Sequence, residues 1–267
     1  MFKLKPLLCY AFLVLSVLSH AQNEANNWFF GENAGLDFSS GGPVAISTGQ
    51  IDCMEGTASI SDPVSGALLF YSDGRTVWDA THNIMPNGTG LAGGASSTMA
   101  ALIVPLPGSS TIYYLFTTDD YQNLGANGFN YSIVDMAANS GLGDVVSKNN
   151  LLFGSCAEVN HAVKHANCTD YWIMGRDLTG NTYRAFLLTS SGLNLSPVVS
   201  SVGRAITTPG FGAGKFSPNG KKFAKAYGTS APSGNIQLFD FNILTGQLSN
   251  PVRLYPIHPW YGVSFSP

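Results

Sequence analysis

Charged residues are scarce in this 267-residue chain, at 11% of the sequence. Thirteen Lys and Arg residues stand against sixteen Asp and Glu residues, which leaves a formal net charge of -3 and no basic stripe. A protein that binds nucleic acid needs clustered positive charge to displace the counterions of the phosphates. The composition therefore argues against a nucleic-acid partner.

Long apolar runs are missing from the interior of the chain, where none approaches the ~18 residues of a membrane-spanning helix. At the N-terminus, two lysines precede the apolar run Leu7–Leu18, and a small-x-small cleavage site ends at Ala21. This order is typical of a signal peptide, and the apolar run is short for a membrane span. We expect residues 1–21 to be removed and residues 22–267 to form a secreted or cell-surface domain without a membrane span.

Cysteine is also rare, and after cleavage only Cys53, Cys156 and Cys168 remain. An odd number leaves at least one thiol without a partner in the same chain. No C-x-x-C pair offers closely spaced metal ligands. Cys156 and Cys168 are expected at opposite ends of one strand, beyond the ~6 Å between Cα atoms that a disulfide needs. The sequence therefore predicts three unpaired, partly buried thiols and no metal centre.

Glycine, proline and aromatic residues are plentiful, with 30 Gly, 14 Pro and 12% aromatics. The stretch Glu55–Asp79 shows how they are arranged. Short runs of β-branched and aromatic residues at 58–61, 68–71 and 76–78 alternate with turns rich in Gly, Pro, Asp and Ser. Such punctuation is typical of an antiparallel meander, and it predicts an all-β fold.

The meander recurs along the chain. The last apolar residue before the first turn of each unit is Ile60, Ile103, Val163, Phe216 and Phe265, at spacings of 43, 60, 53 and 49 residues. A period near fifty with three or four short strands per unit is typical of a β-propeller. We therefore predict a β-propeller of four-stranded antiparallel blades, with about five blades present.

The predicted strands fall into five groups, separated by turns and by a Gly/Ser-rich link at 87–98. They are 28–30, 35–38 and 43–46; 58–61, 68–71 and 76–78; 100–104, 111–117, 130–135 and 150–153; 161–164, 171–176, 183–189 and 198–202; 213–216, 222–226, 235–241 and 252–255.

Residues 260–267 are expected to begin one more unit and to stop at its first turn. Two explanations compete. The chain could be a truncated piece of a larger ring, of about seven blades. Alternatively, this last strand could close the ring by supplying the inner strand that the first group lacks. The truncated ring is favoured, although it would expose an unpaired edge.

Four motifs carry a resemblance to a known family. They are N-N-W-F-F-G-E-N-A-G-L-D-F at 26–38, M-P-N-G-T-G at 85–90, N-G-F-N-Y-S-I-V-D-M at 127–136 and A-V-K-H-A-N at 162–167. Together with the meander they resemble secreted Bacteroidetes proteins with an N-terminal propeller of WD-like or YVTN-type repeats. The resemblance implies export, often by type IX secretion, and a link to gliding motility. It supplies no catalytic residues, and this sequence departs from the family pattern in ending before a C-terminal sorting domain, so the resemblance implies no means of anchoring.

Few residues are candidates for a functional site. Glu55, Glu158 and His161 stand at the starts of predicted inner strands, where they would face the channel mouth, and Trp260 follows a proline in a connecting loop. His165 is four residues after His161 but is expected in a turn, and no third zinc ligand accompanies the pair. The four tryptophans, Trp28, Trp78, Trp172 and Trp260, recur at similar places in the units, which favours packing between blades over sugar stacking.

The loop 119–128 is rich in oxygen ligands, among them Asp119 and Asp120. Calcium prefers such ligands, but their spacing differs from the D-x-[DN]-x-[DN]-G pattern. A solvated loop is therefore the default, with calcium at Asp119 and Asp120 as the alternative. No other cofactor is expected.

No catalytic constellation emerges from these candidates. We expect a non-enzymatic extracellular module that binds a protein or a glycan through loops at one mouth of the ring, where strand ends converge. One alternative is an enzyme with a site at the channel mouth, either a polysaccharide lyase or hydrolase or a quinoprotein-like oxidoreductase. Another is a purely architectural spacer in a long adhesin.

Overall fold

The computed structural model describes residues 23–207, 211–228, 235–254 and 260–266. The predicted signal peptide and the end of the predicted strand 252–255 lie outside these ranges. The regular structure of the described part is almost entirely β-strand, with 3-10 turns only at η1 (Asn23–Ala25) and η2 (Asn139–Gly141). No described helix has the length and apolar character of a membrane span.

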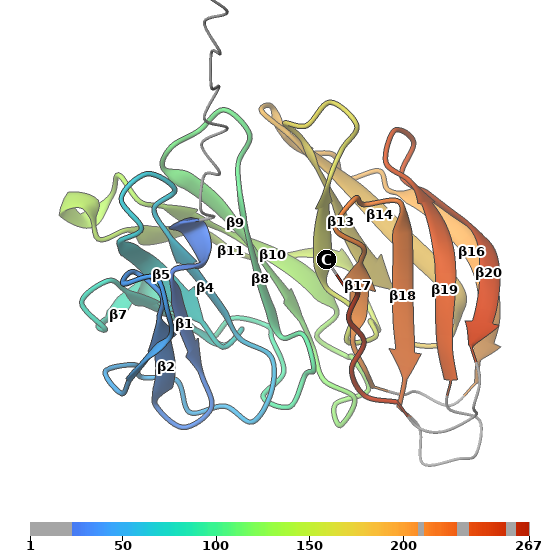
Figure 1. Cartoon of the computed structure of the whole chain (residues 1–267), viewed down its shortest axis with the longest axis horizontal. Coiled ribbons are helices and arrows are strands. Elements are labelled where there is room, and N and C mark those ends of the chain that lie inside the picture. The colour runs from blue at the N-terminus through green and yellow to red at the C-terminus, as the bar shows by residue number, and fades with distance from the viewer. Residues whose placement is uncertain (1–22, 208–210, 229–234, 255–259, 267) are drawn as a thin grey trace, which may run out of the picture.

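Within the described residues, twenty strands form five antiparallel sheets of three to five strands (Figure 1). Sheet 1 contains β1 (Asn27–Phe30), β2 (Ala34–Asp37) and β3 (Val44–Ile46). Sheet 2 contains β4 (Ala58–Ser61), β5 (Leu68–Ser72), β6 (Thr76–Asp79) and β7 (Ile84–Thr89). Sheet 3 contains β8 (Ala101–Pro105), β9 (Ile112–Thr118), β10 (Phe129–Asp135) and β11 (Asp144–Phe153). Sheet 4 contains β12 (His161–Lys164), β13 (Tyr171–Arg176), β14 (Gly180–Thr189), β15 (Gly192–Leu193) and β16 (Val198–Ile206). Sheet 5 contains β17 (Gly214–Phe216), β18 (Lys222–Tyr227), β19 (Asn235–Asn242) and β20 (Gln247–Leu254).

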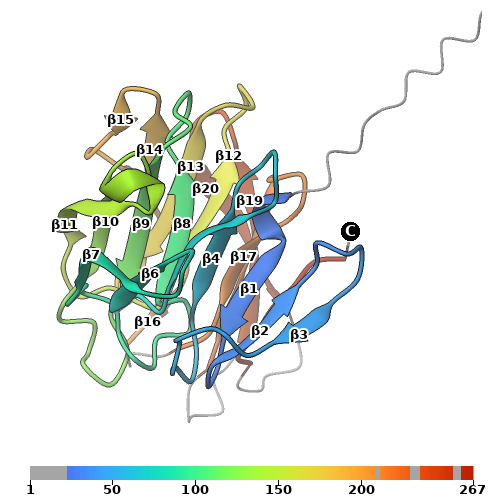
Figure 2. The same cartoon turned by 90° about the vertical axis from the view of Figure 1, so that its left-hand side faces the viewer.

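Each sheet is built from consecutive strands, and the sheets follow one another in chain order. The first strands lie side by side, because β1 contacts β4, β4 contacts β8, β8 contacts β12 and β12 contacts β17. Sheets 1 and 2 lie at one side of the molecule and sheet 5 at the other (Figures 1 and 2). The prediction of an all-β chain with five successive antiparallel units is confirmed.

Four apolar cores separate the five sheets. Phe29 of sheet 1 packs with Tyr71 and Trp78 of sheet 2. Three larger clusters lie in turn between sheets 2 and 3, sheets 3 and 4, and sheets 4 and 5. An internal sheet is therefore covered on both faces, and its strands have apolar residues at both alternating sets of positions, because successive side chains point to opposite faces.

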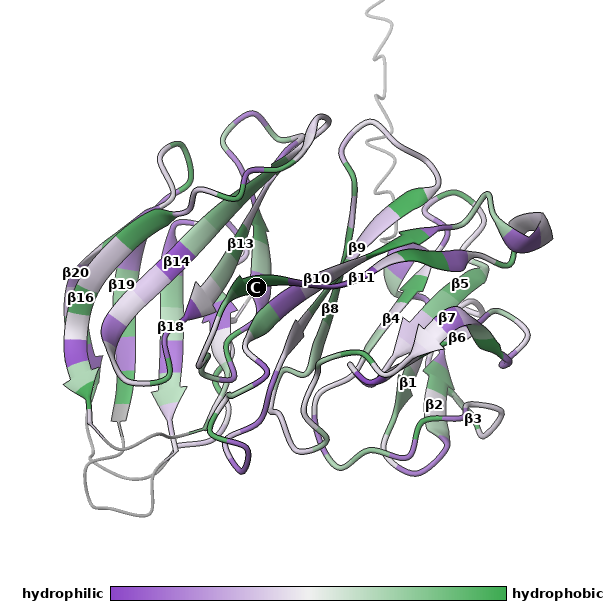
Figure 3. Cartoon of the chain, turned by 180° about the vertical axis from the view of Figure 1, so that it is seen from behind, coloured by the Kyte–Doolittle hydropathy of each residue, from purple (hydrophilic) through white to green (hydrophobic). Residues whose placement is uncertain are grey.

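Strand β9 shows how one segment serves two cores. Successive side chains of a strand point to opposite faces of its sheet. Tyr113 and Leu115 belong to the core shared with sheet 2, whereas Tyr114 and Phe116 belong to the core shared with sheet 4. On β14 the polar residues are concentrated in the first half of the strand, and the apolar run Ala185–Leu188 follows them, as the purple and green parts of this strand in Figure 3 show.

Several strand predictions were wrong, among them the start of β20, which lies at Gln247 instead of residue 252. β7 occupies part of the predicted link 87–98, and β11 begins at Asp144 instead of residue 150. Both are outer strands with register shifts against their neighbours, and such bulges accommodate residues such as Asn87 and Asn149 at positive φ. Residues 260–266 form no strand; their backbone is linked to the entry of sheet 5 by the Ala213 N–H, which donates to the Tyr261 carbonyl at 2.8 Å.

The three cysteines are unpaired, as predicted. Cys53 and Cys156 are buried, but Cys168 is exposed in the turn between β12 and β13, so its predicted partial burial was wrong. The tryptophan prediction was also only partly right. Trp78 and Trp172 are buried in cores between sheets, whereas Trp28 is 47% exposed. The alternation of β1 turns Phe29 into the core and leaves Trp28 on the opposite face.

Tyr71 is a test of the packing between sheets 1 and 2. Its ring is fully buried, and the ring centroids of Phe29 and Trp78 lie 4.4 and 5.4 Å away. Its hydroxyl also accepts the Gln50 N–H at 3.1 Å. We expect Tyr71→Ala to lower the free energy of unfolding by about 3–5 kcal/mol, because it leaves a cavity in this core. Urea unfolding measures the change. Val64→Ala, at an 86% exposed side chain, is the control and should stay within about 0.5 kcal/mol; equal losses in both variants would contradict the prediction.

Candidate functional site

Glu158 lies just before β12 and is only 2% exposed. Its Oε2 accepts the backbone N–H of Thr98 at 2.9 Å and also the Thr98 hydroxyl. Its Oε1 accepts the backbone N–H of Tyr121 at 2.7 Å. These bonds favour the carboxylate, but burial outweighs them and raises the pKa of Glu158, and the Glu55 charge adds to the rise.

Thr98 connects this carboxylate to two more segments. Its Oγ1 lies 3.2 Å from the Tyr261 hydroxyl, and it accepts the Gly212 N–H at 3.4 Å. Gly212 has a φ of +111°, and a Cβ there would lie 2.7 Å from the Ala226 carbonyl, so a glycine is needed for this close approach. Four segments that are distant in sequence therefore meet around Glu158. Those of Thr98 and Tyr121 contact it directly, and those of Gly212 and Tyr261 contact it through Thr98.

Glu55 completes this group, which we name the Glu158 cluster (Glu55, Ser96, Thr98, Tyr121, Glu158 and Tyr261). One oxygen, Oε1, accepts the Ser96 hydroxyl at 3.2 Å, whereas Oε2 is buried without a well-aligned donor. Burial raises the pKa of Tyr261, and its interaction with Glu55 is the next cause. The two predicted acids thus lie close enough for the charge of Glu55 to raise the pKa of Glu158.

Lys225 lies on β18, close to the Glu158 cluster, and is 2% exposed. Its ammonium donates to the Gly212 carbonyl. Burial, followed by the charge of Arg176, lowers the pKa of Lys225 to about 7, and the Glu158 charge opposes this shift. Gly212 therefore has two polar partners in this region: its carbonyl accepts from Lys225, and its N–H donates to Thr98.

The geometry limits what the Glu158 cluster can do chemically. A general acid must reach the atom it protonates, with a heavy-atom distance of about 3 Å or one bridging water. Glu158 is buried and already accepts three hydrogen bonds from Thr98 and Tyr121. Glu158 is therefore better arranged to hold neighbouring loops together through hydrogen bonds, which we call its fastening role, than to transfer a proton.

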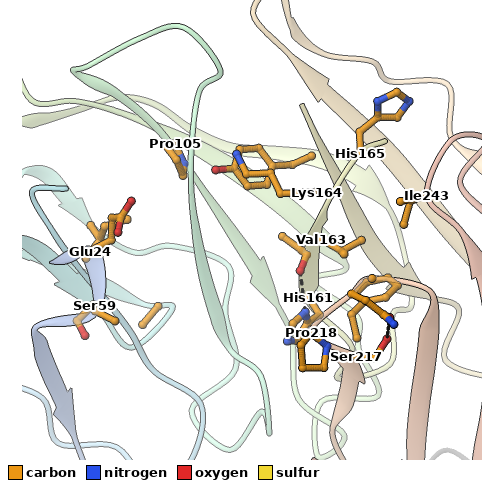
Figure 4. Close-up of a pocket in the computed structure, with 18 of the residues that line it drawn as sticks. Glu24, Ser59, Pro105, His161, Val163, Lys164, His165, Ser217, Pro218 and Ile243 are labelled. Carbon is orange, nitrogen blue, oxygen red and sulfur yellow. Dashed lines mark hydrogen bonds between the residues drawn. The ribbon is translucent and has the colours of Figure 1, made fainter. Parts of the chain in front are cut away.

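A cavity of about 940 Å³ lies in a different place, between sheets 1 and 2 on one side and sheets 4 and 5 on the other (Figure 4). Glu24 and Ser59 lie on the first wall, and His161, Lys164 and His165 lie on the second. Trp28 and Phe30, which are 47% and 38% exposed, also line it, as does Tyr171. The Lys164 ammonium lies 3.8 Å from the centre of the Tyr171 ring.

His161 belongs to this cavity and makes no hydrogen bond or ion pair with Glu55 or Glu158 among the contacts of the described residues. It lines this cavity as a polar residue of β12, and its predicted place at a channel mouth stays a prediction. His165 lies at the turn after β12, where its Nδ1 accepts the Asn167 N–H at 3.1 Å. Its Nε2 therefore faces the Leu244 carbonyl, at 3.2 Å, as a donor. Trp260, the fourth predicted site residue, is 37% exposed and lies next to Tyr261 of the cluster.

The loop proposed for calcium is held together by its own donors. Asp119 Oδ2 accepts hydrogen bonds from the Asn123 amide and the Asn127 N–H, both at 2.7 Å, and Asp120 Oδ1 accepts the Asn123 N–H at 2.9 Å. Over the described ranges no group of three or more His, Cys, Asp and Glu side chains is arranged to hold a metal ion. Calcium at this loop stays a prediction.

Sequence reasoning missed Thr98, Tyr261, Lys225 and the exposed face of Trp28. Thr98 stood in a link of small residues that gave no signal. Lys225 did give one, because it is the only charge within the otherwise apolar run Phe223–Tyr227. Such a residue on a buried strand requires a polar partner.

Thr98→Val tests the fastening role. Valine keeps the volume but removes the hydroxyl that serves Glu158, Gly212 and Tyr261, which leaves buried polar groups with fewer partners. We expect a loss of about 1–3 kcal/mol in the free energy of unfolding. Thr89→Val, at an exposed side chain, is the matched control. If chemical denaturation gives the two variants the same stability, the fastening role is wrong.

Lys225 predicts a pH dependence of stability. Its pKa is about 7 in the folded state and near 10.5 when exposed, so between these values only the unfolded state holds the proton. The free energy of unfolding should therefore rise with pH from about 7 upwards, by at most about 1.4 kcal/mol per pH unit, and this contribution should be lost as the pH falls to 7. Denaturant titrations between pH 6 and 9 should show that Lys225→Met removes this slope while Lys221→Met, at an exposed position, keeps it. Parallel curves for wild type and Lys225→Met would contradict the prediction.

Comparisons with known proteins leave the family open. No family model matches the chain, and no curated protein matches it in sequence. Among solved structures, the chain is similar to a Bacteroides uniformis protein assigned as a 6-phosphogluconolactonase, with a TM-score of 0.39 and 14% identity over 85% of this chain and 79% of that one. It is also similar to an α-L-arabinofuranosidase from Clostridium thermocellum, with a TM-score of 0.38 and 13% identity over 76% and 63% of the two chains. Both likenesses are too distant to assign an activity.

Proposed function

We propose that this protein is a secreted or cell-surface β-propeller domain that binds a glycan without chemical turnover. The propeller is supported by the order of the sheets. Consecutive strands build each sheet, neighbouring sheets pack face to face, and the first strands lie side by side. Radial repetition of four-stranded sheets has this pattern. Export rests on the signal sequence, and the relation to secreted Bacteroidetes proteins rests on the quoted motifs.

The observation that carries glycan binding is the half-exposed Trp28 on the wall of the 940 Å³ cavity. Its Nε1 donates to the Ala25 carbonyl at 2.8 Å and its ring contacts Phe38, with centroids 4.9 Å apart, so its position is set before any ligand arrives. A preset aromatic ring offers an apolar surface at little entropic cost.

The opposite wall supplies the polar groups that orient a ligand. Lys164 offers an ammonium, and His161 offers a ring nitrogen at the same side of the cavity (Figure 4). A few convergent polar groups in a largely apolar concavity are typical of small-ligand sites. A sugar has both an apolar ring face and hydroxyl groups, and it matches this division between the two walls.

A second candidate is a glycan-cleaving enzyme acting at the Glu158 cluster, and the proximity of Glu55 and Glu158 favours it. Glycosidases use two carboxyl groups whose surroundings push their pKa values apart. Burial does raise the pKa of Glu158. However, Glu158 is buried and already accepts three hydrogen bonds, which is why we place this candidate second.

Trp28→Ala tests the binding site. The full-length protein is titrated with cello-, manno-, xylo- and galacto-oligosaccharides by calorimetry. We expect at least one series to bind, and Trp28→Ala to weaken it about tenfold or more, since the stacking surface is lost. Trp260→Ala is the matched control, because Trp260 is also partly exposed but does not line the cavity.

Two results would overturn the proposal. Binding that Trp260→Ala removes and Trp28→Ala leaves unchanged would move the site away from the cavity. Release of new reducing ends from these oligosaccharides, abolished by Glu55→Gln, would establish the enzyme instead.

A further inference from the structure

His161 stands out among the cavity residues because one ring nitrogen is held by a hydrogen bond while the other has no partner among the described residues. Its Nδ1 lies 2.9 Å from the Ala162 carbonyl oxygen. A carbonyl can only accept, so Nδ1 carries the hydrogen of this bond. In a neutral imidazole the other nitrogen, Nε2, is then an acceptor with a free lone pair.

The surroundings keep this ring neutral. Burial lowers the pKa of His161 to about 4, and the charge of Lys215 lowers it further, whereas the bond to Ala162 opposes both. Phe216 of β17 packs edge-on against the ring, with centroids 5.7 Å apart at 65°. An imidazole in this setting cannot serve as a cation for an acidic ligand at neutral pH.

The described residues provide no hydrogen-bond donor to Nε2, although the ring lines the cavity. An acceptor held in place and left without a partner suits a ligand that brings its own donor. A sugar hydroxyl is such a donor, and it is small and uncharged.

We propose that His161 Nε2 accepts a hydrogen bond from a hydroxyl group of the bound ligand and thereby selects a neutral, hydroxyl-bearing sugar over a deoxy counterpart. This inference rests on the proposed function, in which a glycan occupies the cavity against Trp28. A site with a buried acceptor rejects an analogue that lacks the matching hydroxyl, because the acceptor then loses water without gaining a bond.

The first experiment separates His161 from Trp28. His161→Phe keeps a ring beside Phe216 but removes the acceptor, and His161→Gln keeps an acceptor in its amide oxygen. The full-length variants are titrated with the oligosaccharide that binds the wild type and with its single-deoxy forms, after circular dichroism and melting curves confirm that they fold. We expect His161→Phe to weaken binding about tenfold or more and to bind one deoxy form as well as the parent sugar, and His161→Gln to retain part of the preference.

The second experiment uses pH. Below about pH 4 the protonated ring donates from Nε2, so the affinity of the wild type should fall, whereas between pH 5 and 8 it should stay level. Glu24, Lys164, His165 and Lys215 are the other ionisable side chains at or near the cavity. His161→Gln retains all of them, so only the difference between its pH profile and that of the wild type reports on His161.

Each outcome decides the matter. Trp28-dependent binding that is unchanged in His161→Phe would overturn the role of His161 and leave the proposed function standing. Failure of every oligosaccharide to bind the wild type would overturn both. A nitrogen NMR spectrum that places the hydrogen on Nε2 at neutral pH would also overturn the inference, without any ligand.

Discussion

The structure depends on the need of each internal sheet to bury both of its faces. A strand such as β9 has large apolar side chains on both sides, with Tyr113 and Leu115 on one and Tyr114 and Phe116 on the other. Either face left in water would forfeit roughly 25 cal/mol for each square ångström of apolar area. The sheets must therefore stack in series, and that order places their first strands next to one another.

This arrangement has a consequence for the inner part of the molecule. The first strands are sheet edges, and their backbone groups need partners other than a neighbouring strand. Side chains supply several of them. The Thr57 and Ser59 hydroxyls donate to the carbonyls of Phe29 and Asn27, at 2.9 and 2.6 Å. Polar residues therefore gather at the inner edges for structural reasons, and the Glu158 cluster is the most developed example.

The same reasoning explains why the candidate acids need not be catalytic. Glu55 and Glu158 were candidates because both stand at the start of the first strand of a unit, and each also follows a cysteine by two residues. Equivalent places in successive units do converge, so their proximity follows from the repeat. Their partners do not follow from it, because Thr98 and Tyr261 belong to connecting segments without a repeated pattern.

The sequence alone determined the all-β class, the number of successive units and most strand bounds, because turn residues and two-residue alternation are local properties. β12 and β13, for example, lie where the pattern placed them. Tertiary structure decided which polar residues meet. It separated His161 from Glu158, although only two residues lie between them, and it joined Glu158 to Thr98, which is sixty positions away. It also turned Trp28 towards a cavity while Trp78 and Trp172 entered cores. These outcomes depend on how neighbouring sheets pack, and no short stretch of sequence contains that information.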